Sequence, residues 1–217
     1  MISGPRHLCL LYDGAPSRHL PAIATVFRQK LKQNRRCLYL NSPPMVAGLK
    51  SQLAADGLDV EGVIAAGKLV LSSHQHHVDG DFDIEAMLQV LRQALGQALN
   101  DKYEGLFATG DMTWEFGPKR NFSKLLEYEW RLEEFIRENP QMSGICQYHG
   151  DTLPREILRI GLITHRELFV SETLSMINPQ FLRNDAASEA ITPRSEIDDF
   201  IDRILAQAFV NRAAPAS

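Results

Sequence analysis

The sequence lacks the features of a secreted or membrane protein. Its only three cysteines, Cys9, Cys37 and Cys146, lie far apart in apolar runs, which excludes a disulfide framework and favours buried free thiols. The first residues, MISGPRHLCLLYDG, contain no positive segment followed by a long apolar region, so they are not a secretory signal. No window approaches the roughly 18 uninterrupted apolar residues of a membrane span. We therefore expect a cytoplasmic protein with no membrane partner.

Excess positive charge is also absent. The net charge of the 217 residues is −4, and basic residues are scattered apart from a short cluster over residues 30–36. This balance provides no electrostatic footprint for nucleic acid, so no direct nucleic-acid partner is predicted. With 44% apolar and 23% charged residues, the composition is that of an ordinary globular protein. The length suits one large domain with a full core.

The turn after the first apolar run lacks the residues of a phosphate-binding loop. Such a loop presents a run of backbone N–H groups, usually as GxxxxGK[ST], with the lysine on the phosphates. Residues 13–19 read DGAPSRH, with one glycine, no lysine, a proline without an N–H and an acid that repels phosphate. ATP hydrolysis is therefore not expected, and no cofactor is predicted.

Short apolar runs alternate with amphipathic helical segments along the chain. The predicted strands are His7–Tyr12, Cys37–Leu40, Leu69–Ser72, Gly105–Ala108, Ile145–Tyr148 and, as an edge strand, Leu168–Val170. The predicted helices are Leu20–Leu31, Val46–Leu53, Val60–Ala65, Ile84–Leu99, a helix through Phe122–Ile136, Pro154–Thr164 and Glu196–Phe209. This alternation predicts a single α/β domain, a mostly parallel sheet with helices on both faces.

The stretch from Tyr103 to Ile136 is the most informative. Its strand breaks at Gly110, and the helix that follows has a carboxylate, Glu129, within its apolar stripe. The stripe consists of Phe122, Leu125, Leu126, Leu132 and Ile136. A glutamate that faces a core needs a partner, because an unpaired buried charge costs several kcal/mol. The pattern therefore indicates a polar site between strand end and helix.

Polar and aromatic residues also gather at the predicted carboxyl ends of the strands, where parallel sheets bind ligands. The residues predicted to line a pocket there are Tyr12, Asp111, Trp114, Glu129 and Tyr148. Asp111 and Glu129 could form a carboxylate pair for acid/base chemistry, or Glu129 could brace its helix; we favour the brace. The aromatic residues either wall a pocket or close the core. No Ser-His-Asp or Cys-His grouping can be assembled, so no catalytic residue is predicted.

One polar segment contains residue types that commonly bind metal ions. His74 and His76 alternate on an extended chain, and Asp79 could add a hard ligand. A second segment would have to complete the site, with His149 or Cys146 as its source. Surface histidines in a polar loop are commoner, so no metal site is predicted, and His74, His76 and Asp79 are only weak candidates.

Five short motifs occur in the order in which the MEDS family has them. They are HLCLLY at 7–12, GDMTW at 110–114, LEYE at 126–129, CQY at 146–148 and TH at 164–165. Over about residues 5–185 the chain thus resembles this sensory domain of methanogens and methylotrophs, which is related to the sensory half of a dichloromethane-responsive regulator. The family commonly has Glu at the position of Asp111 and an acid at the position of His149.

The resemblance implies a RecA/KaiC-like fold that lacks its phosphate loop, and a sensory role for small hydrocarbon-derived ligands. It leads us to expect one non-catalytic domain over residues 1–217, with a core at about 5–185 and a C-terminal helix at about 196–209. This domain would bind a small apolar or halogenated ligand and signal through a partner such as a kinase or regulator, or through self-association. The alternatives are a degenerate nucleotide-binding enzyme that uses Asp111 for Mg²⁺, and a pure interaction or oligomerisation module.

Overall fold

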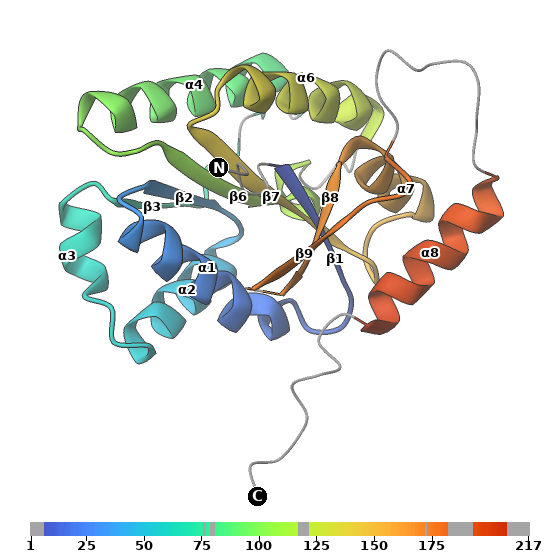
Figure 1. Cartoon of the computed structure of the whole chain (residues 1–217), viewed down its shortest axis with the longest axis horizontal. Helices are drawn as coiled ribbons and strands as arrows, with labels where there is room; N and C mark the ends of the chain where they lie inside the picture. The colour runs from blue at the N-terminus through green and yellow to red at the C-terminus, as the bar shows by residue number, and fades with distance from the viewer. Residues whose placement is uncertain are drawn as a thin grey trace, which may run out of the picture.

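The fold is built on one large sheet. The computed structural model describes residues 7–75, 77–78, 81–116, 122–171, 173–181 and 193–207. The strands of this sheet are β1 (His7–Tyr12), β2 (Arg36–Leu40), β3 (Leu69–Ser72), β6 (Leu106–Asp111), β7 (Met142–His149), β8 (Glu167–Ser171) and β9 (Leu174–Ile177). Their order is β3-β2-β6-β7-β1-β8-β9, and all pairs are parallel except the antiparallel pair β8–β9 (Figure 1). A separate short pair joins β4 (His77–Val78) to β5 (Asp81–Phe82).

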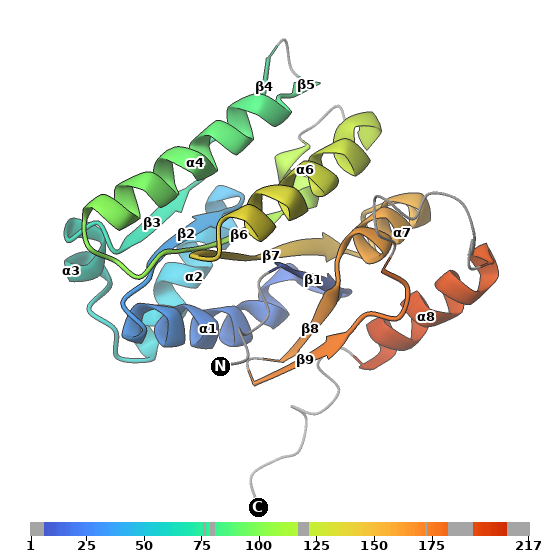
Figure 2. The ribbon, with the colours of Figure 1, turned by 45° about the horizontal axis from the view of Figure 1, so that its top comes forward.

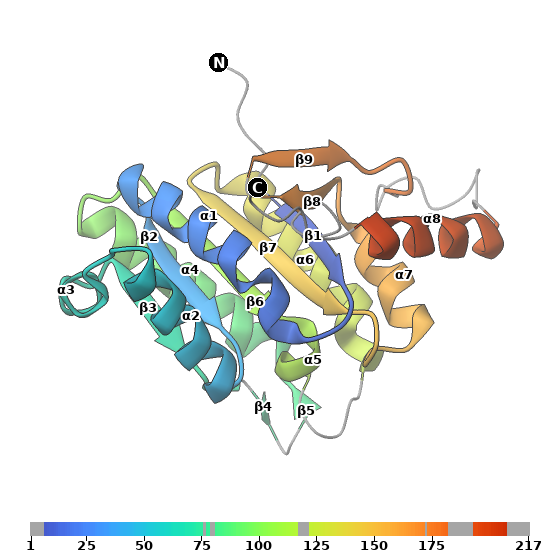
Figure 3. The same ribbon diagram turned by 90° about the horizontal axis from the view of Figure 1, so that it is seen from below.

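Helices cover both faces of the sheet. They are α1 (Leu20–Lys32), α2 (Pro43–Ala55), α3 (Val60–Ala65), α4 (Ile84–Asn100), α5 (Met112–Glu115), α6 (Leu125–Glu138), α7 (Arg155–Thr164) and α8 (Arg194–Gln207), with short 3₁₀ segments at Pro16–His19 and Phe122–Lys124. Figure 2 shows α4 and α6 on one side of the sheet and α1 and α2 on the other. In Figure 3, α8 lies beside α7 at the end of the molecule nearest β8 and β9. The predicted α/β class is confirmed.

Two hydrophobic clusters, one on each face, hold these layers together. The first lies under α4, α6 and α7 and takes Cys9 and Leu11 from β1. The second lies under α1 and α2 and takes Leu10 and Tyr12 from the same strand. Successive side chains of a strand point to opposite faces, so β1 and β7 each contribute to both clusters.

Several predicted boundaries were wrong. Strand β6 does not break at Gly110 but runs to Asp111, because Gly110 and Asp111 stay in register with Cys146 and Gln147 of β7. The predicted edge strand is an inner one, since β9 pairs with its outer side. Within the predicted apolar stripe of α6, Leu126 is 40% exposed. The last helix begins at Arg194 rather than Glu196, and Phe209 lies outside the described residues.

The prediction for the cysteines is confirmed, since all three are free and buried. In the described part of the chain, no helix is both long enough and apolar enough to cross a lipid bilayer.

Candidate functional site

Among the described residues, buried polar side chains of interest gather at two places around the sheet, and the first lies at its carboxyl edge. The Tyr12 hydroxyl donates to Asp111 Oδ2 at 2.8 Å, and the backbone N–H of Trp114 donates to Asp111 Oδ1 at 2.8 Å. Asp111 thus caps the short helix α5. Burial raises the pKa of Asp111, although these hydrogen bonds act in the opposite direction. The ring of His149 stacks on that of Tyr12 with 4.7 Å between ring centroids.

The turn after β1 is closed by groups of the protein itself. The N–H of Gly14 donates to Asp151 Oδ2 at 2.7 Å, and the Gly14 carbonyl lies 2.9 Å from His149 Nε2. Gly14 has a φ of 71°, a conformation that costs glycine little. The Asp151 carboxylate therefore accepts the hydrogen bond of an N–H group that a phosphate-binding loop would offer to its ligand. This agrees with the sequence of the turn.

The second group lies inside the protein, between the sheet and α6, and we call it the Glu129 cluster: His7, Glu129, Cys146, Tyr148 and His165. Glu129 projects from α6 and is 0% exposed. The Tyr148 hydroxyl donates to Glu129 Oε1, and Cys146 Sγ lies 3.7 Å from Oε2 as a second donor. Tyr148 and Cys146 share one face of β7 because they are two residues apart.

Two histidines complete the cluster. His7 Nε2 lies 3.6 Å and His165 Nε2 lies 3.5 Å from Glu129 Oε2. Cys146 Sγ lies 3.4 Å from His7 Nε2. His7 begins β1, whereas His165 follows α7, so the chain topology brings together segments that are distant in sequence.

The outer ring nitrogens of both histidines have partners. His7 Nδ1 lies 2.9 Å from Glu133 Oε2, one turn along α6 from Glu129. His165 Nδ1 lies 2.6 Å from the carbonyl oxygen of Gly161 in α7. When each Nδ1 carries the proton, each Nε2 directs a lone pair toward Glu129. Ring orientation and tautomer are therefore set from outside the cluster.

Burial controls the charge of this cluster. It raises the pKa of Glu129 to about 8, although the Tyr148 and Cys146 hydrogen bonds lower it in part. Burial also lowers the pKa of His7 to about 3 and keeps that of His165 well below its usual range. The pKa of the Cys146 thiol is raised, first by burial and then by Glu129. Near pH 7 the cluster is therefore mainly neutral.

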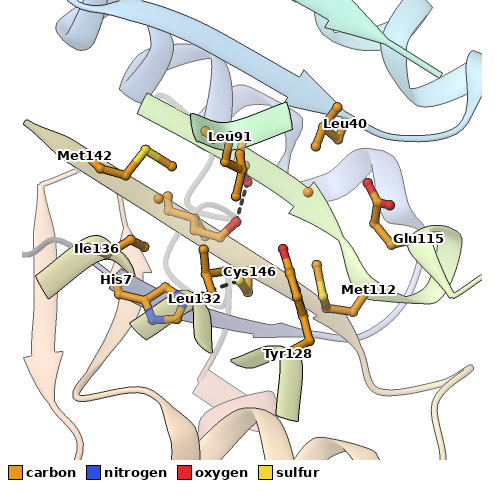
Figure 4. Close-up of a pocket in the computed structure, with 15 residues that line it drawn as sticks. His7, Leu40, Leu91, Met112, Glu115, Tyr128, Leu132, Ile136, Met142 and Cys146 are labelled. Atoms are coloured by element: carbon orange, nitrogen blue, oxygen red, sulfur yellow. Dashed lines mark hydrogen bonds between the residues drawn. The ribbon is translucent and has the colours of Figure 1, made fainter. Parts of the chain in front are cut away.

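A small cavity of about 30 Å³ adjoins the cluster, and Figure 4 shows His7 and Cys146 at its wall. Its apolar lining includes Leu40, Leu91, Met112, Leu132, Ile136 and Met142. Glu115 and Tyr128 add polar atoms to this lining. A water molecule needs about 10–15 Å³ measured in this way, so the space holds about two or three waters or a very small organic molecule.

The five predicted site residues do not surround one space. Tyr12, Asp111 and the backbone of Trp114 belong to the strand-end group, whereas Glu129 and Tyr148 belong to the buried cluster. Tyr12 and Tyr148 lie in the clusters on opposite faces of the sheet. None of the five lines the 30 Å³ cavity. The sheet therefore separates Tyr12 from Tyr148, whereas the side chain of Trp114 packs against the same cluster as Tyr148.

Sequence reasoning missed His7 and His165 as members of the site. His7 belongs to the motif HLCLLY and His165 to the motif TH. Neither lies in an apolar helical stripe or at a predicted carboxyl end of a strand, so no pattern in the sequence indicated a role for them. Of the weak metal candidates, His74 is exposed, while His76 and Asp79 lie outside the described residues. Among the described residues, the group whose donor atoms could surround an ion consists of His7, Glu129, Cys146 and His165.

Comparison with known proteins identifies the family. The family model "MEthanogen/methylotroph, DcmR Sensory domain" matches residues 6–166, most of the chain. The chain belongs to the MEDS family. Because the family is a sensory one, this MEDS domain has a sensory or regulatory role. No curated protein matches the chain.

A solved structure independently supports the fold of this MEDS domain. It resembles a KaiC-like protein from the hyperthermophilic archaeon Pyrococcus horikoshii, with a TM-score of 0.53 and 14% identity. The match covers 75% of this chain and 69% of the other. At this identity the likeness concerns the fold alone, and it confirms the predicted RecA/KaiC-like α/β fold.

Proposed function

We propose that this MEDS domain senses a very small apolar or halogenated molecule, which binds in the cavity beside the Glu129 cluster. The cavity itself is the observation that carries this proposal. Its walls are mostly apolar, and the polar atoms of His7 and Cys146 lie on one side. Its volume of about 30 Å³ favours ligands of one or two carbon atoms.

The walls of the cavity can adapt to such a ligand. Met112 and Met142 both line it, and methionine side chains are unbranched, polarizable and able to repack around irregular shapes. A bound molecule would press on α6 through Leu132 and on β7 through Cys146. Ligand entry would thus be transmitted to two elements of the core.

We further propose that the signal passes to a protein partner through β9. This strand forms one edge of the sheet, and its side chains Leu174 and Ile177 are 56% and 79% exposed. Exposed edge strands pair readily with other chains. The nucleotide alternative gains no support from the turn after β1, where Asp151 occupies the Gly14 N–H.

Thermal unfolding with a series of halogenated methanes and short hydrocarbons tests the ligand. A compound present at about 100 times its Kd should add about 2.7 kcal/mol to the free energy of unfolding. Ala108→Val adds two methyl groups inside the cavity and should abolish this gain. Ala94→Val makes the same change in α4 outside the lining and should retain it.

ATP with Mg²⁺ serves as the comparison ligand and should not change the melting temperature. The proposal fails if no compound of the series stabilises the wild type, or if Ala108→Val responds as strongly as Ala94→Val. Stabilisation by ATP would favour the nucleotide alternative instead.

A further inference from the structure

We propose that His7, Glu129, Cys146 and His165 form a binding site for one transition-metal ion of the Zn²⁺ class. The four donors come from β1, α6, β7 and the residue after α7. All four side chains are buried, and one donor atom of each lies within 4.8 Å of the other three. This site shares His7 and Cys146 with the wall of the cavity proposed above, but it is argued from the donor geometry and needs no bound small molecule.

Four of the six distances between the donor atoms are close to those of tetrahedral coordination, and all six are within 4.8 Å. With metal–nitrogen and metal–oxygen distances near 2.0–2.1 Å and a metal–sulfur distance near 2.3 Å, neighbouring donors should lie about 3.3–3.6 Å apart. His7 Nε2 and His165 Nε2 lie 3.6 and 3.5 Å from Glu129 Oε2. Cys146 Sγ lies 3.4 Å from His7 Nε2 and 3.7 Å from Glu129 Oε2. An ion could be accommodated with small side-chain movements.

The groups around the donors are those of a metal site. Histidine ligands usually donate their other N–H to a carboxylate or a backbone carbonyl, which fixes the ring. Glu133 provides the carboxylate for His7, and the Gly161 carbonyl provides the acceptor for His165. Tyr148 donates to Glu129 Oε1 and leaves Oε2 directed at the other donors.

One ring nitrogen, His165 Nε2, also favours a ligand at the cluster. His165 Nε2 is buried and has no hydrogen-bond partner among the described residues. A buried polar nitrogen without a partner is unfavourable, and such atoms are uncommon in folded proteins. A metal ion would satisfy this lone pair without any further donor.

The donor types select the ion. One thiolate, two imidazoles and one carboxylate suit Zn²⁺, and Co²⁺ serves as its spectroscopic substitute. The thiolate and the carboxylate together carry two negative charges, which balance a divalent cation in the interior. Four protein ligands close the coordination sphere, as in structural zinc sites. The ion would join α6 and α7 to the central strands.

Titration of the metal-free full chain with Co²⁺ tests the site. We expect one ion per chain, a near-ultraviolet thiolate-to-cobalt charge-transfer band, and d–d bands of the intensity typical of tetrahedral coordination. Zn²⁺ should displace Co²⁺ with loss of both signals. Cys146→Ser should remove the charge-transfer band and weaken binding by more than tenfold. Glu133→Gln, which changes only a supporting group, should weaken it about 10–100-fold.

Cys37→Ser is the matched control, because Cys37 is also a buried free cysteine but packs in the hydrophobic cluster on the opposite face. It should bind Co²⁺ as the wild type does. The inference is overturned if the wild type binds no Co²⁺, if its spectrum lacks the thiolate band, or if Cys146→Ser and Cys37→Ser bind alike. If Cys146→Ser does not fold, the wild-type spectrum decides the question.

Discussion

The contact between Gly161 and Tyr148 leads to a sharp prediction about how α7 supports the buried cluster. Gly161 lies inside α7, and a Cβ atom added there would come within 2.7–2.8 Å of three Tyr148 ring atoms. Real Cβ contacts are essentially never below 3.0 Å, so one group would have to move. Tyr148 cannot swing into solvent, because it is 0% exposed and its hydroxyl donates to Glu129.

The expected cost of Gly161→Ala combines two opposing effects. Alanine is favoured over glycine inside a helix by about 1 kcal/mol. Overpacking of a close-packed core costs about 1–3 kcal/mol. The net change should therefore be a loss of about 0–2 kcal/mol in the free energy of unfolding.

Gly96→Ala is the matched control, since Gly96 lies inside α4 and a Cβ there meets nothing within 4 Å. This variant should gain up to about 1 kcal/mol from helix propensity alone. The difference between the two variants isolates the contact with Tyr148 and should be about 1–3 kcal/mol.

Urea unfolding followed by circular dichroism measures both variants against the wild type, with equal slopes as the condition for comparison. For a domain of this size, each 1 kcal/mol corresponds to roughly 2–4 °C in melting temperature. If Gly161→Ala is as stable as Gly96→Ala, the ring of Tyr148 is not held in place, and the rigid arrangement of the Glu129 cluster is refuted.

Two further predictions concern other contacts. Tyr12→Phe leaves the buried carboxyl of Asp111 with one hydrogen-bond donor fewer and should cost about 1–3 kcal/mol in urea unfolding; an unchanged midpoint would mean that water replaces the hydroxyl. Arg159 donates to both carboxylate oxygens of Asp198, at 2.8 and 2.6 Å, and lowers the pKa of Asp198. This pair therefore stabilises the docking of α8 on α7 fully above pH 3.8, the ordinary pKa of the carboxyl group. The stabilisation is lost as the pH falls through the lower pKa of the folded state. Asp198→Asn should therefore speed amide exchange in α8 at neutral pH, and this difference from the wild type should shrink as the pH falls below 3.8. Equal exchange rates in the variant and the wild type at neutral pH would contradict the pairing.

The sequence predicted the layers of the fold well because their signals are local. The apolar runs became β1, β2, β3, β6 and β7, and the 3.6-residue period placed α4 and α6. Strand β9 was missed because it has only four residues, and its sequence, LSMI, is too short to show a clear alternation. The continuation of β6 through Gly110 depends on pairing with β7, which the sequence of β6 alone does not contain.

Part of the candidate site could also be predicted, because its signal is local in the sequence. Glu129 was recognised because a charged residue within the apolar stripe of a helix is unusual and is visible in the sequence of that helix alone. His7 and Cys146 are 139 residues apart, so their contact depends on the strand order rather than on any spacing. The opposite placement of Tyr12 and Tyr148 was also hidden, because both faces of a parallel sheet are buried and its strands show no polar alternation.

Successive side chains of β7 point to opposite faces of the sheet, so this one strand contributes to both polar groups. Gln147 bonds to His19, and His149 stacks on Tyr12, on the α1 side of the sheet. Cys146 and Tyr148 face Glu129 on the α6 side. In sheets of this kind, ligands normally bind beyond the carboxyl edge. Here Asp111 and the N–H group of Gly14 at that edge already have hydrogen-bond partners within the protein. The ligand and the ion that we propose would bind in the interior instead, and a change there would reach the carboxyl edge through the backbone of β7.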